Sequence, residues 1–295
     1  MQIRTVALLS PGDMGHAIGA VLQRSGLRVI TNLRDRSART QALAKAAGIS
    51  DVPDDESLVR EADLLLSIMP PVSAYTLGER IASTLRHIET DLIFVDCNAI
   101  APRTAQALDH LLTEAGAAFV DAGIIGGPPH PDETGPRLYV SGARAGDVAH
   151  LNEYGLDVRV VGTQSGQASG LKMCYASITK GLTALATTAL VAGRTMDLQE
   201  ELLAELQDLA IFRSIKRSVP AMPPKAYRWV GEMQEIARTF ADLGLPAQMP
   251  EGAGALYHFI EGTELGLETP EQRQRGQTLE EVTEILAAAL EQRNS

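Results

Sequence analysis

The feature that most constrains the fold is an alternation of short apolar runs with amphipathic segments over about the first 163 residues. Several runs are almost continuously apolar, as strands covered on both faces are. Between them lie segments such as residues 15–26, where Ile18, Val21 and Leu22 share a helical face. This order predicts an α/β fold with a doubly wound, mostly parallel sheet. The expected strands are TVALLS, RVITNL, DLLLSIM, LIFVDCN, AAFVDAGI, RLYVSG and DVRVVG.

Strand patterns stop after residue 163, and a second type of organisation begins. Residues 165–193 form one long helix-like run, and further helical runs follow from residue 197, interrupted by SVPAMPPK, LGLPAQMPEGAG and LETP. We therefore expect residues 1–163 to form one domain and residues 164–295 to form an all-α C-terminal domain, joined by a long interdomain helix. The Pro/Gly-rich segment GGPPHPDETGPR is either a mobile flap or a long connection.

Charge and composition exclude several classes of function. A formal net charge of -11 argues against a nucleic acid or a membrane surface as partner, because either would require a basic footprint. The longest apolar stretches fall short of the roughly 20 residues of a membrane helix, and the N-terminus lacks a secretory signal pattern. Cys97 and Cys174 form no CxxC motif, and no histidine or acidic spacing indicates a metal site. A cytoplasmic location and no metal are expected.

Residues 6–26, VALLSPGDMGHAIGAVLQRSG, predict a strand, a tight turn and a helix. Gly12 would let a pyrophosphate approach the backbone, Gly15 would permit close packing of helix on strand, and the helix N-terminus would offer unpaired N–H groups. The usual glycine motif begins here with Ser10, so the pattern is incomplete. Its place at the first strand favours a Rossmann dinucleotide-binding domain. The expected cofactor contacts are Gly12, Asp13, Met14 and Gly15.

The end of the second expected strand, RVITNLRDRSART, bears on the choice between NAD and NADP. NAD sites usually carry a carboxylate there for the ribose, whereas NADP sites lack it and have an arginine nearby. Asn32 stands at this position, which favours NADP(H), with NAD(H) as the alternative because a shift of register would make Asp35 the ribose acid. A solvated charged loop is the structural alternative. The residues that can serve a 2′-phosphate are Arg34, Arg36, Ser37 and Arg39.

Five motifs in order, GDMGHAIG, IMPPVSA, VDCNAIAPRTA, FVDAGIIGG and SGQASGLKMCYA, resemble the β-hydroxyacid dehydrogenase superfamily, which includes 3-hydroxyisobutyrate and 6-phosphogluconate dehydrogenases. The segment PPKAYRWVGEMQEIARTFADLGLP resembles the phosphogluconate-dehydrogenase-like helical domain of a less characterised branch. The resemblance implies a Rossmann domain, an all-α domain, an active site in the cleft between them and a homodimer through the helical domains. It also implies cofactor contacts at Met69, Pro70 and Asn98, and a catalytic lysine at Lys172.

A lysine at Lys172 suits hydride transfer at a hydroxyl or carbonyl carbon. Partial burial lowers the pKa of a lysine towards neutrality, so that its amine can accept the hydroxyl proton in oxidation and return it in reduction. Lys180, two turns along and offset by about 80°, is expected to be structural or at an interface. Tyr175 and Thr179 share more of the Lys172 face and are expected substrate contacts, with core packing as the alternative. Trp229 is expected to form a wall of the substrate pocket, again with core packing as the alternative.

Departures from the family pattern concern the substrate. The family has an asparagine where this chain has Ala176, and Ser-Gly-Gly where it has Ile125, Gly126 and Gly127. Asn98 stands where relatives have a small hydroxyl residue, so it is expected to contact substrate as well as cofactor. Loss of two polar contacts favours a less polar or bulkier alcohol, aldehyde or ketone over a highly charged hydroxy acid.

The sequence thus predicts an NADP-dependent oxidoreductase that acts on a small substrate. Two alternatives remain open. One is an imine reductase, although the retained lysine favours carbonyl chemistry. The other is a nucleotide-binding regulatory protein without turnover.

Overall fold

The computed structural model describes residues 2–129, 135–269 and 272–294. By its internal contacts the chain divides into two compact units, Met1–Met173 and Cys174–Ser295. The expected boundary at 163/164 lies at the end of the last strand, whereas the units divide about two turns into the long helix that follows. The middle of the Pro/Gly-rich segment, residues 130–134, lies outside the described residues, so neither interpretation of that segment is tested.

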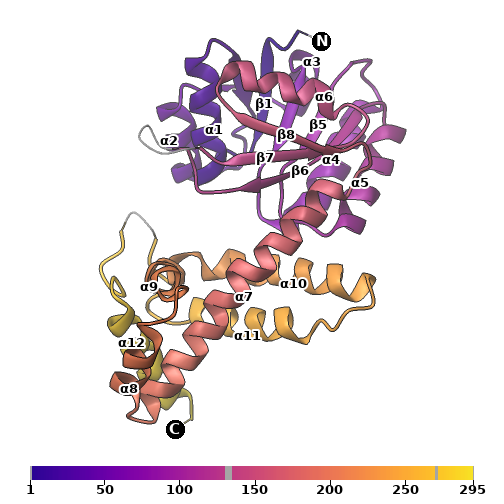
Figure 1. Ribbon diagram of the computed structural model, residues 1–295. Coiled ribbons are helices and arrows are strands. Elements are labelled where there is room, and N and C mark those ends of the chain that lie inside the picture. Colours follow the sequence, from indigo (N-terminus) through magenta and orange to yellow (C-terminus); the bar gives the residue numbers. More distant parts are fainter. Residues whose placement is uncertain (1, 130–134, 270–271, 295) are drawn as a thin grey trace. The chain divides into compact units, whose positions relative to one another are not determined.

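The first unit contains an eight-stranded sheet in the order β3-β2-β1-β4-β5-β6-β7-β8 (Figure 1). Strands β1 to β6 are parallel, β7 is antiparallel to β6, and β8 is parallel to β7. The order of the first six strands is that of a Rossmann fold. All seven predicted runs are strands, and the short β3 is an addition. The strands are Thr5–Leu9, Arg28–Thr31, Ser50–Asp51, Leu64–Ser67, Ile93–Asp96, Ala118–Ile125, Arg137–Ser141 and Asp157–Gly162.

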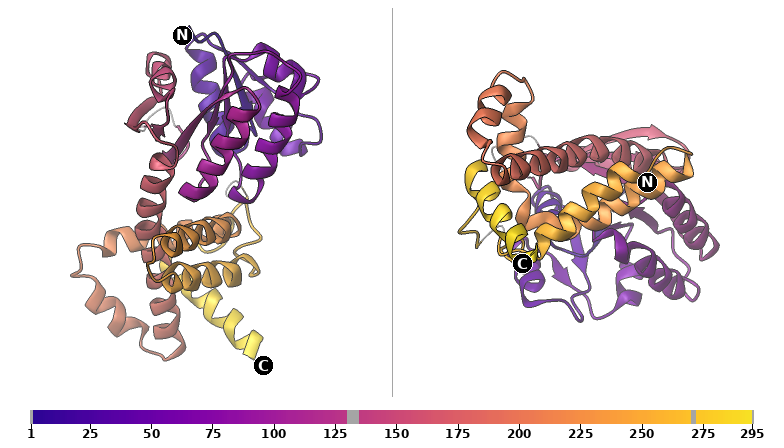
Figure 2. Two further views of the ribbon diagram at one scale, coloured as in Figure 1. Left: turned by 90° about the vertical axis from the view of Figure 1, so that its right-hand side faces the viewer. Right: turned by 90° about the horizontal axis from the view of Figure 1, so that it is seen from below.

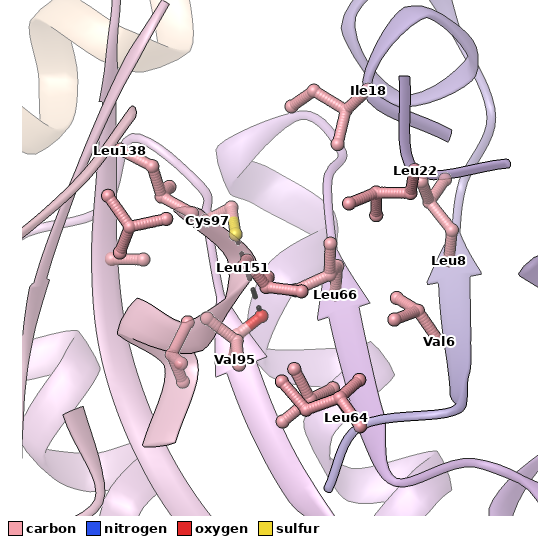
Figure 3. Close-up of a cluster of buried hydrophobic side chains, with 14 of the residues drawn as sticks. Val6, Leu8, Ile18, Leu22, Leu64, Leu66, Val95, Cys97, Leu138 and Leu151 are labelled. Carbon is pink, nitrogen blue, oxygen red and sulfur yellow. Dashed lines mark hydrogen bonds between the residues drawn. The ribbon is translucent and has the colours of Figure 1, made fainter. Parts of the chain in front are cut away.

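Helices cover both faces of this sheet, which confirms the doubly wound prediction. Because successive strand residues point to opposite faces, Val6 and Leu8 join one core while Ala7 and Leu9 join the other. The first core, shown in part in Figure 3, packs against α1, α2, α6 and the 3-10 turn η2. The second packs against α3, α4 and α5. These elements are Asp13–Arg24, Ala38–Ala46, Ala145–Val148, Ala149–Tyr154, Asp55–Glu61, Ala74–Leu85 and Pro102–Glu114. A short 3-10 turn η1, Pro71–Ser73, precedes α4.

The second unit is helical throughout its described residues, as expected. It contains the greater part of the long helix α7 and five further helices, with α10 and α11 packed side by side (Figure 2). Two expected interruptions are shorter than predicted, because Pro220 lies inside α9 and Pro250 lies in the first turn of α11. The helices are α7 Gln167–Thr195, α8 Gln199–Leu206, α9 Phe212–Ala221, α10 Ala226–Asp242, α11 Gln248–Glu261 and α12 Leu279–Asn294; a 3-10 turn η3, Pro223–Lys225, precedes α10.

Candidate functional site

The turn between β1 and α1 has the shape expected of a nucleotide-binding loop. A Cβ at Gly15 would lie 2.5 Å from the Ser10 carbonyl oxygen and 2.9 Å from Leu8 Cδ2, so only glycine allows α1 to begin this close to β1. A Cβ at Gly12 would meet no atom within 4 Å. Within the described chain, the N–H groups of Asp13, Met14 and Gly15 donate to no protein acceptor. The loop therefore offers open backbone donors to an anion.

The loop after β2 is held in place by its own polar side chains. Asn32, which directly follows β2, is buried; its Nδ2 donates to Asp55 Oδ1 at 2.8 Å and its Oδ1 accepts from the Arg34 N–H at 2.9 Å. Arg34 also donates from Nη2 to the Pro53 carbonyl at 2.9 Å. Ser37 caps α2 by accepting from the Thr40 N–H at 3.2 Å. Asn32 and Ser37 thus shape the loop.

A cationic side chain from the first turn of α2 reaches the start of α1. Arg39 pairs with Asp13, the first residue of α1. The guanidinium of Arg36 is half-buried, and burial, followed by the nearby charge of Arg80, lowers its pKa. Arg80, on α4, lies 2.9 Å from Asp55 through its Nε and was not anticipated in the sequence. Arg36, Arg39 and Arg80 therefore lie at the same edge of the sheet as the glycine turn.

Asn98 ties the loop after β5 to the loop after β4. Its Oδ1 accepts from the Met69 N–H at 2.6 Å, and its Nδ2 donates to Ser67 Oγ and to Asp96 Oδ2, both at 2.8 Å. The residue is buried. Any direct contact of this amide with a cofactor or substrate would replace one of these bonds. Pro70, next to Met69, is exposed.

A row of four buried polar side chains crosses four strands, at the last residues of β4, β5 and β7 and in the middle of β6. In the strand registers, Ser67 pairs with Asp96, Asp96 with Asp121, and Asp121 with Ser141, and all four are 0% exposed. Burial, with a smaller contribution from the charge of the adjacent Asp121, raises the pKa of Asp96 to about 7, against hydrogen bonds from Asn98. Burial also raises the pKa of Asp121, against hydrogen bonds from Ser169 and other donors. We call these four residues the polar row.

Lys172 lies over β6, one turn after the start of α7. Its Nζ donates to the Ile124 carbonyl at 2.6 Å, and the side chain is half-buried. A Cβ at Gly123 would lie 2.9 Å from Lys172 Cβ and 3.0 Å from the Ala168 carbonyl oxygen, so glycine is needed for α7 to approach the strand. The amine thus lies at the carboxyl end of the sheet, where open α/β sheets bind ligands.

The three residues at and just after the end of β6 differ in burial and in the space around them. Ile125 is buried and is the last residue of the strand. Gly126 has a φ of 130°, and a Cβ there would lie 2.9 Å from Pro136 Cα, so its conformation and surroundings require glycine. Gly127 is exposed, with open space around it. The two glycines lie at the same edge as Lys172.

Three predicted substrate contacts belong to the second unit, and their contact with substrate stays a prediction. Tyr175 is 43% exposed. The Thr179 hydroxyl donates to the carbonyl of Tyr175 at 3.3 Å, within its own helix. Trp229 packs edge-on against Tyr257, with ring centroids 5.2 Å apart.

Lys180 lies in a buried cluster of this second unit. Its ammonium pairs with Glu232, and its Nζ lies 5.1 Å from the centroid of the Trp229 ring. The Tyr257 hydroxyl donates to the Lys180 carbonyl at 2.6 Å. Burial lowers the pKa of Lys180, against the charge of Glu232, which raises it. This environment agrees with the structural role expected of Lys180.

Sequence reasoning missed Asp121, Ser169, Gly123 and Arg80. A signal for Asp121 was present, since an aspartate inside the apolar run AAFVDAGI is out of place in a strand covered on both faces. Among the described residues, no group of three or more metal-ligating side chains is brought together. No described helix is both long and apolar enough to span a membrane.

Comparisons with known proteins bear on the identity of both regions. Residues 5–154 match the NAD-binding domain of 6-phosphogluconate dehydrogenase, and residues 194–260 match a domain of unknown function. An uncharacterised 28.5 kDa protein of Methanothermus fervidus is 28% identical over 182 residues, which cover 62% of this chain and 68% of that protein. The NAD-dependent L-serine dehydrogenase of Pseudomonas aeruginosa is 27% identical over 127 residues, 42% of each chain.

Solved structures give the same fold. A conserved protein of unknown function, described as structurally similar to 3-hydroxyacid dehydrogenases, has a TM-score of 0.65 at 27% identity and covers 87% of this chain and 96% of its own. The 3-hydroxyisobutyrate dehydrogenase of Mycobacterium tuberculosis has a TM-score of 0.70 at 15% identity over the whole of both chains. With the match to residues 5–154 spanning just over half of its length, the chain belongs to the family of the NAD-binding domain of 6-phosphogluconate dehydrogenase and has the fold of the 3-hydroxyacid dehydrogenases, with a helical C-terminal region.

Proposed function

We propose that the protein is an NADP-dependent oxidoreductase that interconverts a hydroxyl and a carbonyl group on a small substrate of low polarity. The observation that carries this proposal is the position of the Lys172 amine at the carboxyl edge of the sheet that also bears the glycine turn. A proton-transfer group and a dinucleotide-binding loop at one edge are what such a reaction requires.

The residues at the glycine turn fit a dinucleotide. Gly12 leaves space for a pyrophosphate, and the three open N–H groups of the first turn of α1 can donate to it. Met69 lies in the loop after β4, whose backbone is held by Asn98. Asn32 in place of an acid, with Arg34 and Arg36 nearby, supports NADP(H) over NAD(H).

The chemistry divides between cofactor and protein. When bound, the nicotinamide supplies or accepts a hydride. Lys172 Nζ, held at the Ile124 carbonyl, gives a proton to the substrate oxygen in reduction and takes it back in oxidation. The apolar Ile125 and Ala176, where the family has polar residues, support a substrate with few charged groups.

A homodimer through the helical unit is part of the proposal. Along α7, apolar side chains recur at alternating spacings of three and four, the pattern of a helix seam that packs on another helix. Ile178 is 70% exposed and Leu185 is 66% exposed, which is unusual for large apolar side chains at such spacing. The series is Tyr175, Ile178, Leu182, Leu185, Ala189 and Ala192, and Met196, directly after α7, continues it. Two free cysteines, Cys97 and Cys174, support a reducing cytoplasm.

A carbonyl panel with NADPH tests the reaction. We expect loss of NADPH absorbance with apolar aldehydes or ketones and little reaction in the reverse direction with 6-phosphogluconate. Turnover of phosphogluconate above every apolar substrate would overturn the substrate class. Reaction confined to imines would support the reductase alternative, and NADPH binding without any turnover would support a regulatory protein.

A further inference from the structure

Asp121 holds the first turn of α7 in place. Its Oδ2 accepts from the N–H groups of Gly166 and Ser169, both at 2.9 Å, and from Ser141 Oγ at 3.2 Å. Its Oδ1 accepts from Ser169 Oγ at 2.5 Å. Ser141 in turn accepts from the Ala168 N–H at 3.0 Å. Two members of the polar row thus accept the N–H groups of Gly166, Ala168 and Ser169 at the start of α7.

The same strand also receives the lysine. Asp121 and Ile124 are three residues apart on β6, and their partners Ser169 and Lys172 are three residues apart on α7. Gly123, between the two attachment points, lets the helix approach within contact distance. Two attachments along one strand therefore set both the rotation and the height of this helical turn over the sheet.

We propose that Asp121 is a positioning residue for Lys172: by holding the first turn of α7, it places the Lys172 amine at the Ile124 carbonyl, where proton transfer takes place. This inference rests on the proposed function of Lys172 as the acid/base. Ser169 is the intermediary, since it receives the carboxylate through both its N–H and its hydroxyl.

The inference extends to the loop after β4. Asp96, the register partner of Asp121, accepts from Asn98, which binds the Met69 N–H. The loop expected to contact the cofactor and the helix that carries the lysine are thus attached to adjacent members of one buried row. We therefore expect a substitution of Asp121 to displace Lys172 more than it displaces the loop after β4.

The substitution Asp121→Asn tests this, with Asp63→Asn as the matched control. An asparagine keeps the size but replaces one accepting oxygen by an amino group that faces the donors of α7. Asp63 likewise accepts two backbone N–H groups, from Arg4 at 2.7 Å and Thr5 at 2.9 Å, but directly before β4, at the opposite edge of the sheet. In both variants the amide oxygen can still accept the pair of backbone N–H groups and the negative charge is lost, but only Asp121→Asn also removes the oxygen that accepts from the Ser169 hydroxyl.

Two readouts follow Lys172 itself. The first is kcat with the best carbonyl substrate, which we expect Asp121→Asn to lower roughly 10- to 100-fold, because small displacements of a reacting group have effects of that order, while the NADPH Kd stays within about twofold. The second is the pH dependence of Lys172 acylation by acetic anhydride, followed by mass spectrometry of its peptide. We expect this profile to move by roughly one pH unit in Asp121→Asn and to match wild type in Asp63→Asn.

Equal kcat and equal labelling profiles in the two variants would overturn the positioning role. A wild-type protein that reduces no carbonyl would remove the proposed function, and the labelling profile alone would then decide: displaced, it supports positioning of the amine, and unchanged, it refutes it. If Asp121→Asn does not fold, Ser169→Ala, which removes only the hydroxyl donor, gives the same two readouts with a smaller expected change.

Discussion

The two lysines of α7 differ in what holds them. Lys172 is half-buried and donates to a backbone carbonyl at the carboxyl edge of the first unit. Lys180 is buried in the second unit, paired with the carboxylate of Glu232 and stacked near Trp229. Both acceptors favour the charged ammonium, and the full negative charge of the Glu232 carboxylate favours it more strongly than a carbonyl dipole does. We therefore propose different roles for two lysines two turns apart on one helix: proton transfer for Lys172 and packing for Lys180.

The largest effect is expected from removal of the first lysine. Lys172→Ala should lower kcat roughly 10²- to 10⁴-fold, the range of a lost general acid/base, with NADPH affinity nearly unchanged. Steady-state kinetics and NADPH fluorescence titration check both quantities. Equal losses of kcat and NADPH affinity would reassign Lys172 to the cofactor and remove the contrast between the lysines.

Removal of the Glu232 carboxylate, the partner of Lys180, should lower the free energy of unfolding. Glu232→Gln leaves a buried ammonium without its carboxylate, which typically costs about 3–5 kcal/mol of unfolding free energy. Urea unfolding measures the loss. The double variant Lys180→Met with Glu232→Leu should recover part of it, because it leaves no unpaired buried charge. A recovery of zero would show that the pair does not act as a unit.

The polar row should make stability depend on pH. The folded pKa of Asp96 is about 7, above the ordinary value of 3.8, so folding takes up a proton between these limits. Its contribution to stability is therefore fully present below pH 3.8, falls as pH rises towards 7 and is constant above that. Across this range the urea midpoint of wild type should fall with rising pH relative to that of Asp96→Asn, whose amide does not titrate. Parallel curves would contradict the raised pKa.

The smallest effect is expected in the loop after β2, outside both lysine environments. Arg36→Ala should weaken NADPH binding roughly tenfold, the value of one hydrogen bond to a charged group, and leave NADH binding unchanged. The control is Arg60→Ala, an exposed arginine paired with Glu56 within α3. Equal weakening of NADPH and NADH by Arg36→Ala would show that this arginine does not distinguish the cofactors.

Most of the fold was predictable because its signals are local. Apolar runs and helical spacings lie within short windows, so the seven long strands and the all-helical region followed from them, and only the two-residue β3 escaped notice. Motif order similarly pointed to the glycine turn and to Lys172.

The contacts around the site were not predictable in the same way. Asp121 and Ser169 are 48 residues apart and Lys180 and Glu232 are 52 apart, so their pairing depends on strand register and helix packing. Asn98 illustrates the limit: its position was expected, but the three partners of its amide come from the folded loops. Sequence patterns thus located Asn98 and the two lysines but not the side chains that bind them.

The most direct test of the central claim is transfer of deuterium to an apolar carbonyl substrate from NADPH that carries deuterium in both positions at nicotinamide C4. We expect wild type to place deuterium on the new carbinol carbon in stoichiometric amount, and Lys172→Ala to do so at a rate lower by roughly two to four orders of magnitude. Absence of deuterium in the wild-type product, or equal rates for the two proteins, would contradict the account.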